Sequence, residues 1–389
     1  MSLATTVKLV RSDGSTYHYT STSEPLEPQQ RKGFTTRIAF AAAHVVLDPW
    51  RTTEPLTQPV IDWEATLAYR EYLWSLGFGV AEAMDTSQRG MGLEWPQAFE
   101  LIKRSTTAAK TRGALVASGA GTDHLPTGRA LTLDDVTQAY LEQCESIEAV
   151  DGRVILMASR GLAATARHAD DYASVYAKVL SQIRQPVILH WLGPVFDPTL
   201  NGYWGDASLS IAMENCLAVI RENRNKIDGI KISLLDADLE VSMRRQLPAG
   251  VRMYTGDDFN YDRLIQGDEQ GHSDALLGIF DAIAPVASLA LGALDEGDLP
   301  LYQSLLASTV PLSRHIFASP TQHYKTGLVF LAFLNEFQSH FRMVRGMESA
   351  RSTAHLCDLF VLADQARVLR HPELAVQRMR SFLLLAGVA

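Results

Sequence analysis

The sequence is poor in cysteine and has no long apolar run. Its 389 residues include three cysteines, Cys144, Cys216 and Cys357, without the spacing of a metal-binding motif. A small and odd number of cysteines favours a reducing compartment. Because no signal peptide is visible either, we expect a cytoplasmic protein. No apolar run is long enough to cross a bilayer, and we therefore expect no membrane partner.

Basic blocks and glycine-rich phosphate loops are missing as well. The net charge is −9 and the sequence pI is about 5.7. Without a basic patch, nucleic acid is not an expected partner. Hydrophobic residues make up 47% of the chain and charged residues 20%, which is ordinary for a globular protein with a large core.

Short apolar runs alternate with long amphipathic segments through most of the chain. We expect strands at 36–44, 79–85, 114–119, 153–159, 186–191, 227–233, 251–258 and 275–285, of which the last could also be helical. Helical spacing of apolar residues predicts helices at 61–76, 95–105, 133–149, 170–183, 208–223 and 238–246. This alternation favours an α/β fold, a (β/α)8 TIM barrel. An open doubly wound sheet is the competitor, and the lack of a glycine-rich phosphate loop counts against it.

The two ends of the chain depart from this alternation. Residues 7–20 predict a β-hairpin that turns at Ser12-Asp13-Gly14, followed by a polar linker. From 294 onward every segment has helical character, which predicts an all-helical C-terminal extension. We therefore divide the chain into an N-terminal hairpin and linker at 1–33, a barrel at 34–290 and a helical region at 291–389.

Lys231 lies inside the apolar run 227–233. A lysine in a buried strand either pairs with an acid, here Asp257 or Asp258, or becomes an amine in a dry pocket. Desolvation disfavours the ammonium form, and a neutral amine can attack a carbonyl to form a Schiff base.

Polar residues stand at the carboxyl ends of the expected strands, where barrel enzymes place their catalytic groups. Because these ends meet at one mouth of a barrel, we expect the polar residues there to share a site. They are His44, Asp85, Ser118, Ser159, Arg160, His190, Lys231, Asp257 and Asp258.

Two motifs carry a resemblance to a known family. Gly229-Ile230-Lys231 on the sixth strand and Thr255-Gly256-Asp257-Asp258 on the seventh resemble the dihydrodipicolinate synthase / N-acetylneuraminate lyase superfamily. The match is closer to an uncharacterised bacterial subgroup of it. Over 36–310 the resemblance implies a barrel with a Schiff-base lysine on strand six, a helical C-terminal extension and a homo-oligomer, dimer or tetramer. It implies a covalent imine on Lys231 and no cofactor.

The chain also departs from the family pattern. The proton-relaying tyrosine of strand five falls at His190, and Asp85-Thr86-Ser87-Gln88 replaces a paired-threonine loop. These differences point away from the family's best-known reaction. Imidazole can still move protons near neutral pH, so His190 fits acid–base work.

Our leading hypothesis is a class I lyase or aldolase acting on a small oxo acid or a related carbonyl compound. Lys231 is the nucleophile, His190 shuttles protons, and Arg160, with Arg89 as a helper, holds an anionic group through its guanidinium fork. The remaining candidates would orient substrate or water. They are His44, Asp85, Thr86, Ser118, Ser159, Asp257 and Asp258.

Other interpretations stay open. A divalent metal at the barrel mouth could be held by His44, Asp85, Asp123 and His124, or by His44, Asp85 and His190, since imidazole and carboxylate are suitable ligands. Arg160 could form a surface salt bridge, and an aspartate after strand seven could cap a helix. A third possibility is a barrel without catalytic activity that binds a metabolite.

Overall fold

The computed structural model describes residues 5–126 and 128–388, and in it the chain forms two compact units. The first, here the barrel unit, comprises Arg37–Ala43 and Gly79–Leu277. The second, here the helical unit, comprises the chain up to Thr36, His44–Phe78 and the chain from Gly278 onward.

Parallel strands of the barrel unit close into a barrel in the order β10-β3-β4-β5-β6-β7-β8-β9, which confirms the predicted (β/α)8 fold. The strands are β3 (Ala39–Ala42), β4 (Gly79–Glu82), β5 (Val116–Ala120), β6 (Arg153–Leu156), β7 (Val187–Leu192), β8 (Ile227–Ser233), β9 (Arg252–Thr255) and β10 (Asp274–Leu277). Nearly all their residues are buried, which explains why they appear in the sequence as continuous apolar runs.

Alternate strand residues fill the barrel interior, because successive side chains of a strand point to opposite faces. The interior cluster consists of Phe40, Ala42, Ala81, Met84, Ala117, Ile155, Ile188, Tyr254 and Leu276. The cluster identifies the inward face of every barrel strand except β8, and the pairing of Lys231 with Tyr254 identifies it there.

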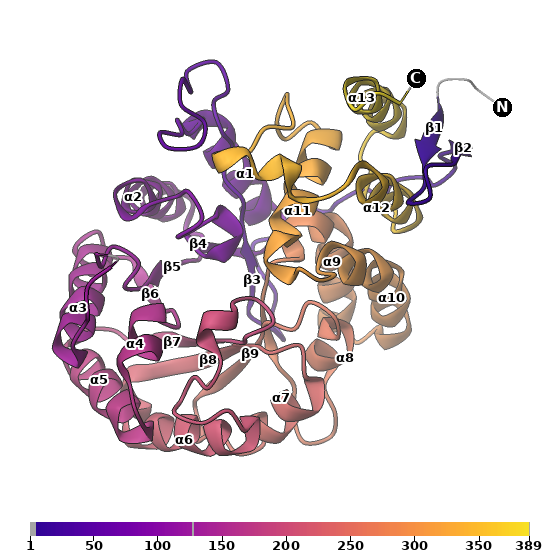
Figure 1. Cartoon of the computed structure of the whole chain (residues 1–389). Helices are drawn as coiled ribbons and strands as arrows, with labels where there is room; N and C mark the ends of the chain where they lie inside the picture. Colours follow the sequence, from indigo (N-terminus) through magenta and orange to yellow (C-terminus); the bar gives the residue numbers. More distant parts are fainter. Residues whose placement is uncertain (1–4, 127, 389) are drawn as a thin grey trace. The chain divides into compact units, whose positions relative to one another are not determined.

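Helices follow the strands of the barrel unit and lie outside them, as Figure 1 shows for α2, α3, α5 and α6. The helices are α2 (Trp95–Arg112), α3 (Leu133–Ala149), α4 (Arg160–Thr165), α5 (Ala169–Gln182), α6 (Leu209–Glu222), α7 (Ala237–Arg244) and α8 (Tyr261–Gln266), with 3₁₀ turns η2 (Asp85–Ser87), η3 (Pro198–Leu200) and η4 (Arg224–Lys226). A capping box between Thr132 and Asp135 begins α3, where the sequence places acidic residues.

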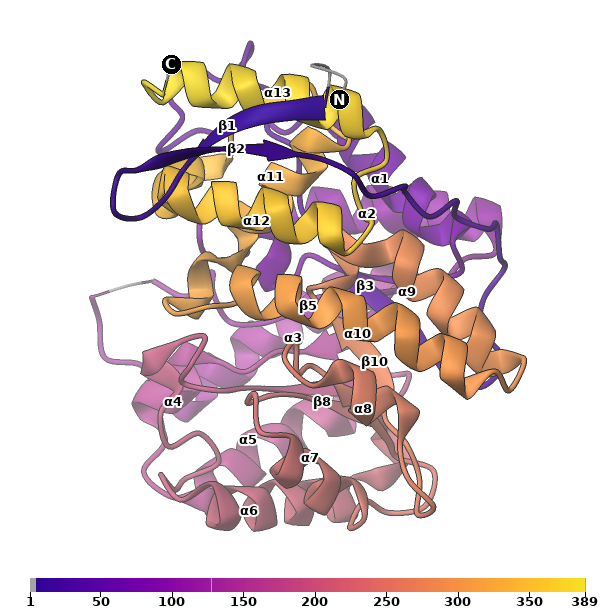
Figure 2. The ribbon, with the colours of Figure 1, turned by 90° about the vertical axis from the view of Figure 1, so that its right-hand side faces the viewer.

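The helical unit contains the N-terminal hairpin and the C-terminal helices, and both predictions are confirmed. Its elements are β1 (Thr6–Val10), β2 (Thr16–Thr20), α1 (Trp63–Ser75), α9 (Phe280–Asp295), α10 (Leu299–Ile316), α11 (Tyr324–Leu334), α12 (Thr353–Gln365) and α13 (Pro372–Leu385), with 3₁₀ helices η5 (Thr321–His323) and η6 (Val344–Ala350). Figure 2 shows the hairpin beside α12 and α13. The buried Asp364 of α12 accepts hydrogen bonds from Tyr19 Oη (2.7 Å) and Ser21 Oγ (2.6 Å), which fix the hairpin to this helix.

The prediction for the eighth strand is wrong in its second half. The run 275–285 was expected to be one strand, but β10 ends at Leu277 and α9 begins at Phe280. Strand and helix are both fully buried here, so the apolar pattern continues across their boundary and does not mark it.

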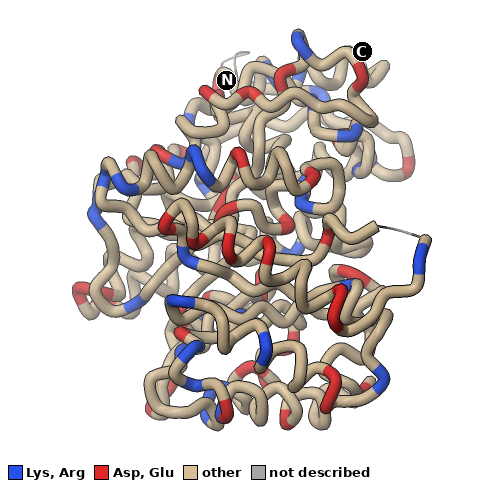
Figure 3. The backbone as a smooth tube through the Cα atoms, turned by 90° about the vertical axis from the view of Figure 1, so that its left-hand side faces the viewer, with Lys and Arg blue, Asp and Glu red and all other residues tan. Residues whose placement is uncertain are grey.

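Charged residues are distributed without blocks of one sign. Figure 3 shows acidic and basic residues interspersed along the chain. No helix in the part of the chain that the structure describes is long and apolar enough to cross a membrane.

Candidate active site

Lys231 lies on β8 with its side chain directed into the barrel. Its strand partners are His190 on β7 and Tyr254 on β9, and Tyr254 belongs to the interior cluster. Lys231 is only 8% exposed, and within residues 5–126 and 128–388 its amine forms no hydrogen bond or ion pair. The amine is thus buried and still available to a ligand.

The surroundings of Lys231 favour its neutral form. Burial lowers the pKa of Lys231, and the negative charges of Asp258 and Asp85 oppose this effect without cancelling it. A lowered pKa increases the fraction of free amine near neutral pH, and the free amine is the form that attacks carbonyl groups.

Gly256 makes room for the lysine side chain. A Cβ atom at this position would lie 2.6 Å from Lys231 Cε and 2.6 Å from the carbonyl oxygen of Ile232, and closer still to Ser233 Oγ. Only glycine fits without displacement of these atoms, which gives the Thr255-Gly256 motif a physical reason. The Ser233 hydroxyl and the lysine Cε are therefore neighbours over the same glycine.

His190 is the nearest candidate for acid–base work. Its Nε2 lies 3.2 Å from Ser233 Oγ, while Nδ1 is buried without a hydrogen-bond partner among the described residues. Burial and the charge of Lys231 lower the pKa of His190 well below its usual range, so the ring is neutral at physiological pH. A neutral imidazole with one unpartnered nitrogen can exchange a proton with a ligand.

Ser233 is a site residue that the sequence reasoning missed. It stands two positions after Lys231 on the same strand, so strand alternation places both side chains on one face. The two-residue spacing from Lys231 could have identified Ser233 from the sequence.

The two aspartates after β9 have different surroundings. Asp257 accepts hydrogen bonds from the backbone of Phe259 (2.8 Å) and Asn260 (3.1 Å) and from Asn260 Nδ2 (2.8 Å), so it closes a turn. Burial raises its pKa. Asp258 is 3% exposed, and its charge acts on Lys231. The structure thus assigns a structural contact to Asp257 and brings Asp258 to the lysine.

Asp85 and Thr86 lie in the turn η2, directly after β4. Asp85 is partly exposed and Thr86 is buried. The carbonyl of Met84 accepts the backbone N–H (3.1 Å) and the hydroxyl (2.7 Å) of Ser87, and the carbonyl of Asp85 accepts the N–H of Gln88 (3.0 Å). These bonds hold the turn so that the charge of Asp85 acts on Lys231.

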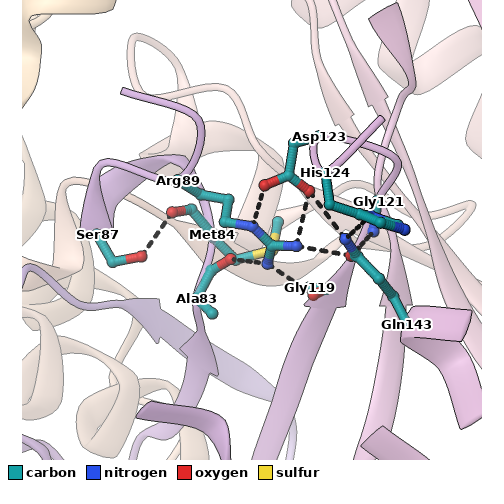
Figure 4. Close-up of polar contacts among 9 residues, drawn as sticks. All are labelled: Ala83, Met84, Ser87, Arg89, Gly119, Gly121, Asp123, His124 and Gln143. Atoms are coloured by element: carbon teal, nitrogen blue, oxygen red, sulfur yellow. Dashed lines mark hydrogen bonds and ion pairs between the residues drawn. The ribbon is translucent and has the colours of Figure 1, made fainter. Parts of the chain in front are cut away.

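Arg89 is a buried structural connection between the ends of β4 and β5 (Figure 4). Its guanidinium pairs with Asp123 through two bonds of 2.7 and 2.8 Å. It also donates to the carbonyls of Ala83 (3.2 Å) and Gly119 (3.1 Å) and to Gln143 Oε1 (2.6 Å). Every nitrogen of Arg89 is engaged, so it cannot hold a ligand as well.

Arg160 and Ser159, predicted to contact the substrate, both have partners within the chain. Arg160 forms an ion pair with Asp197, and its side chain is 55% exposed. Burial alone would raise the pKa of Asp197, but hydrogen bonds from Thr199 and Arg160 outweigh it and keep this pKa low. Ser159 Oγ caps α4 by accepting the N–H of Leu162 (2.9 Å).

Ser118 lies on the outer face of its strand. It alternates with the inward residue Ala117, and its strand partner Glu82 accepts a hydrogen bond from Ser105 of α2 (2.5 Å). The prediction that Ser118 lines the pocket is therefore not supported. A shift of one residue in the expected strand face accounts for the difference.

His44 belongs to the helical unit. Its Nδ1 lies 2.8 Å from Asp281 Oδ2, and its backbone N–H also donates to this oxygen (2.7 Å). His124 Nδ1 is instead bonded to Gln143 of the Arg89 network (2.7 Å). No group of three or more His, Cys, Asp or Glu side chains within residues 5–126 and 128–388 is arranged to hold a metal ion, so the metal alternative lacks support.

Glu240 of α7 is a further buried acid that the sequence did not identify. Its carboxyl accepts hydrogen bonds from Thr255 Oγ1 (3.0 Å) and Ser273 Oγ (2.7 Å). Burial raises the pKa of Glu240 to about 8. Since Thr255 precedes Gly256, this carboxyl supports the end of β9 beside Lys231.

The fold and this site define a (β/α)8 barrel with a buried lysine on its sixth strand. Three solved structures share the fold. They are dihydrodipicolinate synthase from Aquifex aeolicus (13% identity, TM-score 0.64, covering 86% of this chain and 99% of that one), a dihydrodipicolinic acid synthase family protein from an E. coli K12 prophage in complex with pyruvate (12%, 0.62, 91% and 99%) and dihydrodipicolinate synthase from Thermotoga maritima (14%, 0.60, 91% and 99%).

The chain belongs to the family described as "Protein of unknown function (DUF993)", whose model matches residues 7–388. No curated protein matches the chain.

Proposed function

We propose that this protein is a lyase of the class I aldolase type, in which Lys231 forms an imine with a small carbonyl substrate. The observation that carries the proposal is the buried amine of Lys231, with a lowered pKa and no hydrogen bond among the described residues. The shared fold with dihydrodipicolinate synthases supports it, and so does the pyruvate named for the E. coli relative.

The first half of the reaction is imine formation. The lone pair of Lys231 Nζ attacks the carbonyl carbon, a C–N bond forms, and the C=O π electrons move to the oxygen, which takes up a proton to become a hydroxyl. The nitrogen gives up one proton, the hydroxyl takes up a second proton and leaves as water, and the nitrogen lone pair forms the C=N bond of the protonated imine. The neighbouring His190, whose Nδ1 has no partner among the described residues, can move these protons.

The second half is cleavage of a carbon–carbon bond. A hydroxyl on the β-carbon gives its proton to His190, the bond between α- and β-carbons breaks, and its electron pair moves into the enamine, with the iminium nitrogen as the sink. The released fragment leaves as a carbonyl compound. The enamine carbon regains the proton, and water hydrolyses the imine. The reverse sequence is an aldol addition, and neither direction needs an oxidant or reductant. Ser233, through its contact with His190 Nε2, positions the ring.

Reductive trapping tests the proposal. The protein is incubated with pyruvate, hydroxyacetone, dihydroxyacetone or glyceraldehyde and reduced with borohydride, and the modified peptide is identified by mass spectrometry. We expect a single adduct on Lys231 for at least one compound, absent from Lys231→Met.

The matched control is Lys178→Met. Lys178 is 53% exposed and pairs with Asp134 on the outside of the barrel, so this variant should keep the adduct. An adduct that survives in Lys231→Met, or no adduct with any compound, would contradict the proposal.

A further inference from the structure

We infer that Lys231 takes an uncharged hydroxy-aldehyde or hydroxy-ketone rather than an oxo acid, because Arg89 and Arg160, the guanidinium groups expected to hold a substrate carboxylate, are already engaged and the carboxylates of Asp85 and Asp258 act on the amine. This inference rests on the proposed imine function and specifies its substrate class.

The charged side chains that act on the Lys231 amine are negative. Asp85 begins the turn after β4, and Asp258 follows Gly256, whose Cα carries no side chain and lies against Lys231 Cε. Both aspartates act on Lys231 through their negative charge. The protonated imine carries one positive charge against these two carboxylates, so a substrate carboxylate would be a third anion facing a single cation in a largely buried space. Like charges at such distances repel strongly when water is excluded.

The two arginines that could bind a substrate carboxylate are already paired with aspartates. A carboxylate substrate is usually held by a guanidinium fork. Arg89 has every nitrogen engaged by Asp123, Gln143 and backbone carbonyls. The charge of Arg160 is matched by Asp197, whose pKa is kept low, so that carboxylate remains ionised.

Three backbone donors at or directly after the turn η2 are engaged within the chain. The N–H groups of Ser87, Gln88 and Arg89 all donate to carbonyls of Met84 or Asp85. The imidazole of His190 is neutral, since burial and Lys231 lower its pKa, and it adds no positive charge.

Hydroxyl groups suit the same surroundings. Ionised carboxylates accept hydrogen bonds only, and O–H donors bound to them make strong, short bonds. Asp85 and Asp258 can accept from substrate hydroxyls, and the Ser233 hydroxyl beside Lys231 Cε can donate or accept. A polyhydroxylated carbonyl compound brings O–H donors to these carboxylates, whereas a substrate carboxylate in the same place brings none.

Two probes of similar size separate the substrate classes. Pyruvate and hydroxyacetone differ in that one carries a carboxylate where the other carries a hydroxymethyl group. The rate of borohydride-trapped adduct formation on Lys231 is measured for each and divided by the rate with Nα-acetyl-lysine, which corrects for intrinsic carbonyl reactivity. We expect the normalised rate for hydroxyacetone to exceed that for pyruvate by about tenfold or more, the effect of roughly one charge–charge interaction.

Removal of the negative charge of Asp85 gives a second test of the substrate preference. Asp85→Asn should shift the preference toward pyruvate by about threefold or more, whereas Asp134→Asn, at an 81% exposed position on α3, should leave it unchanged. Equal or faster trapping of pyruvate by the wild-type protein would overturn the inference and leave the imine function intact. The absence of adducts with all probes would overturn both.

Discussion

His190 and Lys231 occupy paired positions on the adjacent parallel strands β7 and β8, and burial, with a smaller effect of Lys231, lowers the pKa of the histidine. The pairing places a neutral imidazole beside a buried amine on one face of the barrel. In the proposed function, His190 carries the proton and Lys231 attacks as the free amine.

Asp258 should set the pH at which Lys231 becomes reactive. Its negative charge raises the pKa of the lysine, although burial keeps the net shift downward. In Asp258→Asn the pKa of Lys231 should therefore fall further, and the rise of adduct formation with increasing pH should move to lower pH by about one unit. The measurement is the pH profile of borohydride trapping. Asp134→Asn serves as the control, and a shift to higher pH in Asp258→Asn would disprove this account.

Gly256→Ala should block the lysine without unfolding the barrel. The added Cβ would lie 2.6 Å from Lys231 Cε, so the side chain must leave its position. We expect at least about tenfold slower adduct formation and a loss of about 1–3 kcal/mol in the free energy of unfolding. Gly161→Ala is the matched control, because its Cβ would meet its nearest neighbours at an ordinary 3.4 Å. Urea denaturation and trapping rates check both effects, and unchanged trapping in Gly256→Ala would show that the lysine has another position.

Arg89 should contribute more to stability than to substrate binding. Its pairing with Asp123 is buried, and removal of one partner from a buried pair costs about 3–5 kcal/mol. We expect this loss for Arg89→Met in urea denaturation, and a double-mutant cycle with Asp123→Leu should show strong coupling. If Arg89 instead held the substrate, the variant would retain its stability and show a raised KM.

Glu240 should make stability depend on pH. Its pKa is about 8 in the fold, against roughly 4.3 in the unfolded chain, so the folded state retains a proton that the unfolded state loses. The stabilisation is complete below about pH 4 and is lost as the pH rises through about 8, with an upper bound of about 5 kcal/mol. Glu240→Gln should flatten this decline in unfolding experiments between pH 5 and 9. A variant that declines as steeply as the wild type would assign the effect to other groups.

Strand periodicity predicted the barrel because its strands are buried on both faces and alternate regularly with helices. The same property hid the end of the eighth strand, since the apolar pattern passes from Leu277 into α9 without interruption. Lys231 and His190 could be placed at the mouth because strand order alone brings them together.

Pairings between distant segments could not be predicted in this way. Arg160 and Arg89 look alike in sequence, and only the fold shows that Asp197 and Asp123 neutralise them. Glu240 gave no signal, because an acid in an amphipathic helix normally faces solvent. A shift of one residue reverses the two faces of a strand. Ser118 was predicted to face inward, but its neighbour Ala117 does so instead.

The burial of Lys231 also bears on selection. A lysine whose pKa is lowered by folding opposes folding wherever the unfolded chain would be protonated, so this residue makes the barrel less stable than an apolar side chain would. Random drift would tend to replace it with methionine or leucine, which pack well in such an interior. The proposed function therefore predicts that related chains with the activity keep a lysine at this position, and that chains without the lysine lack the activity.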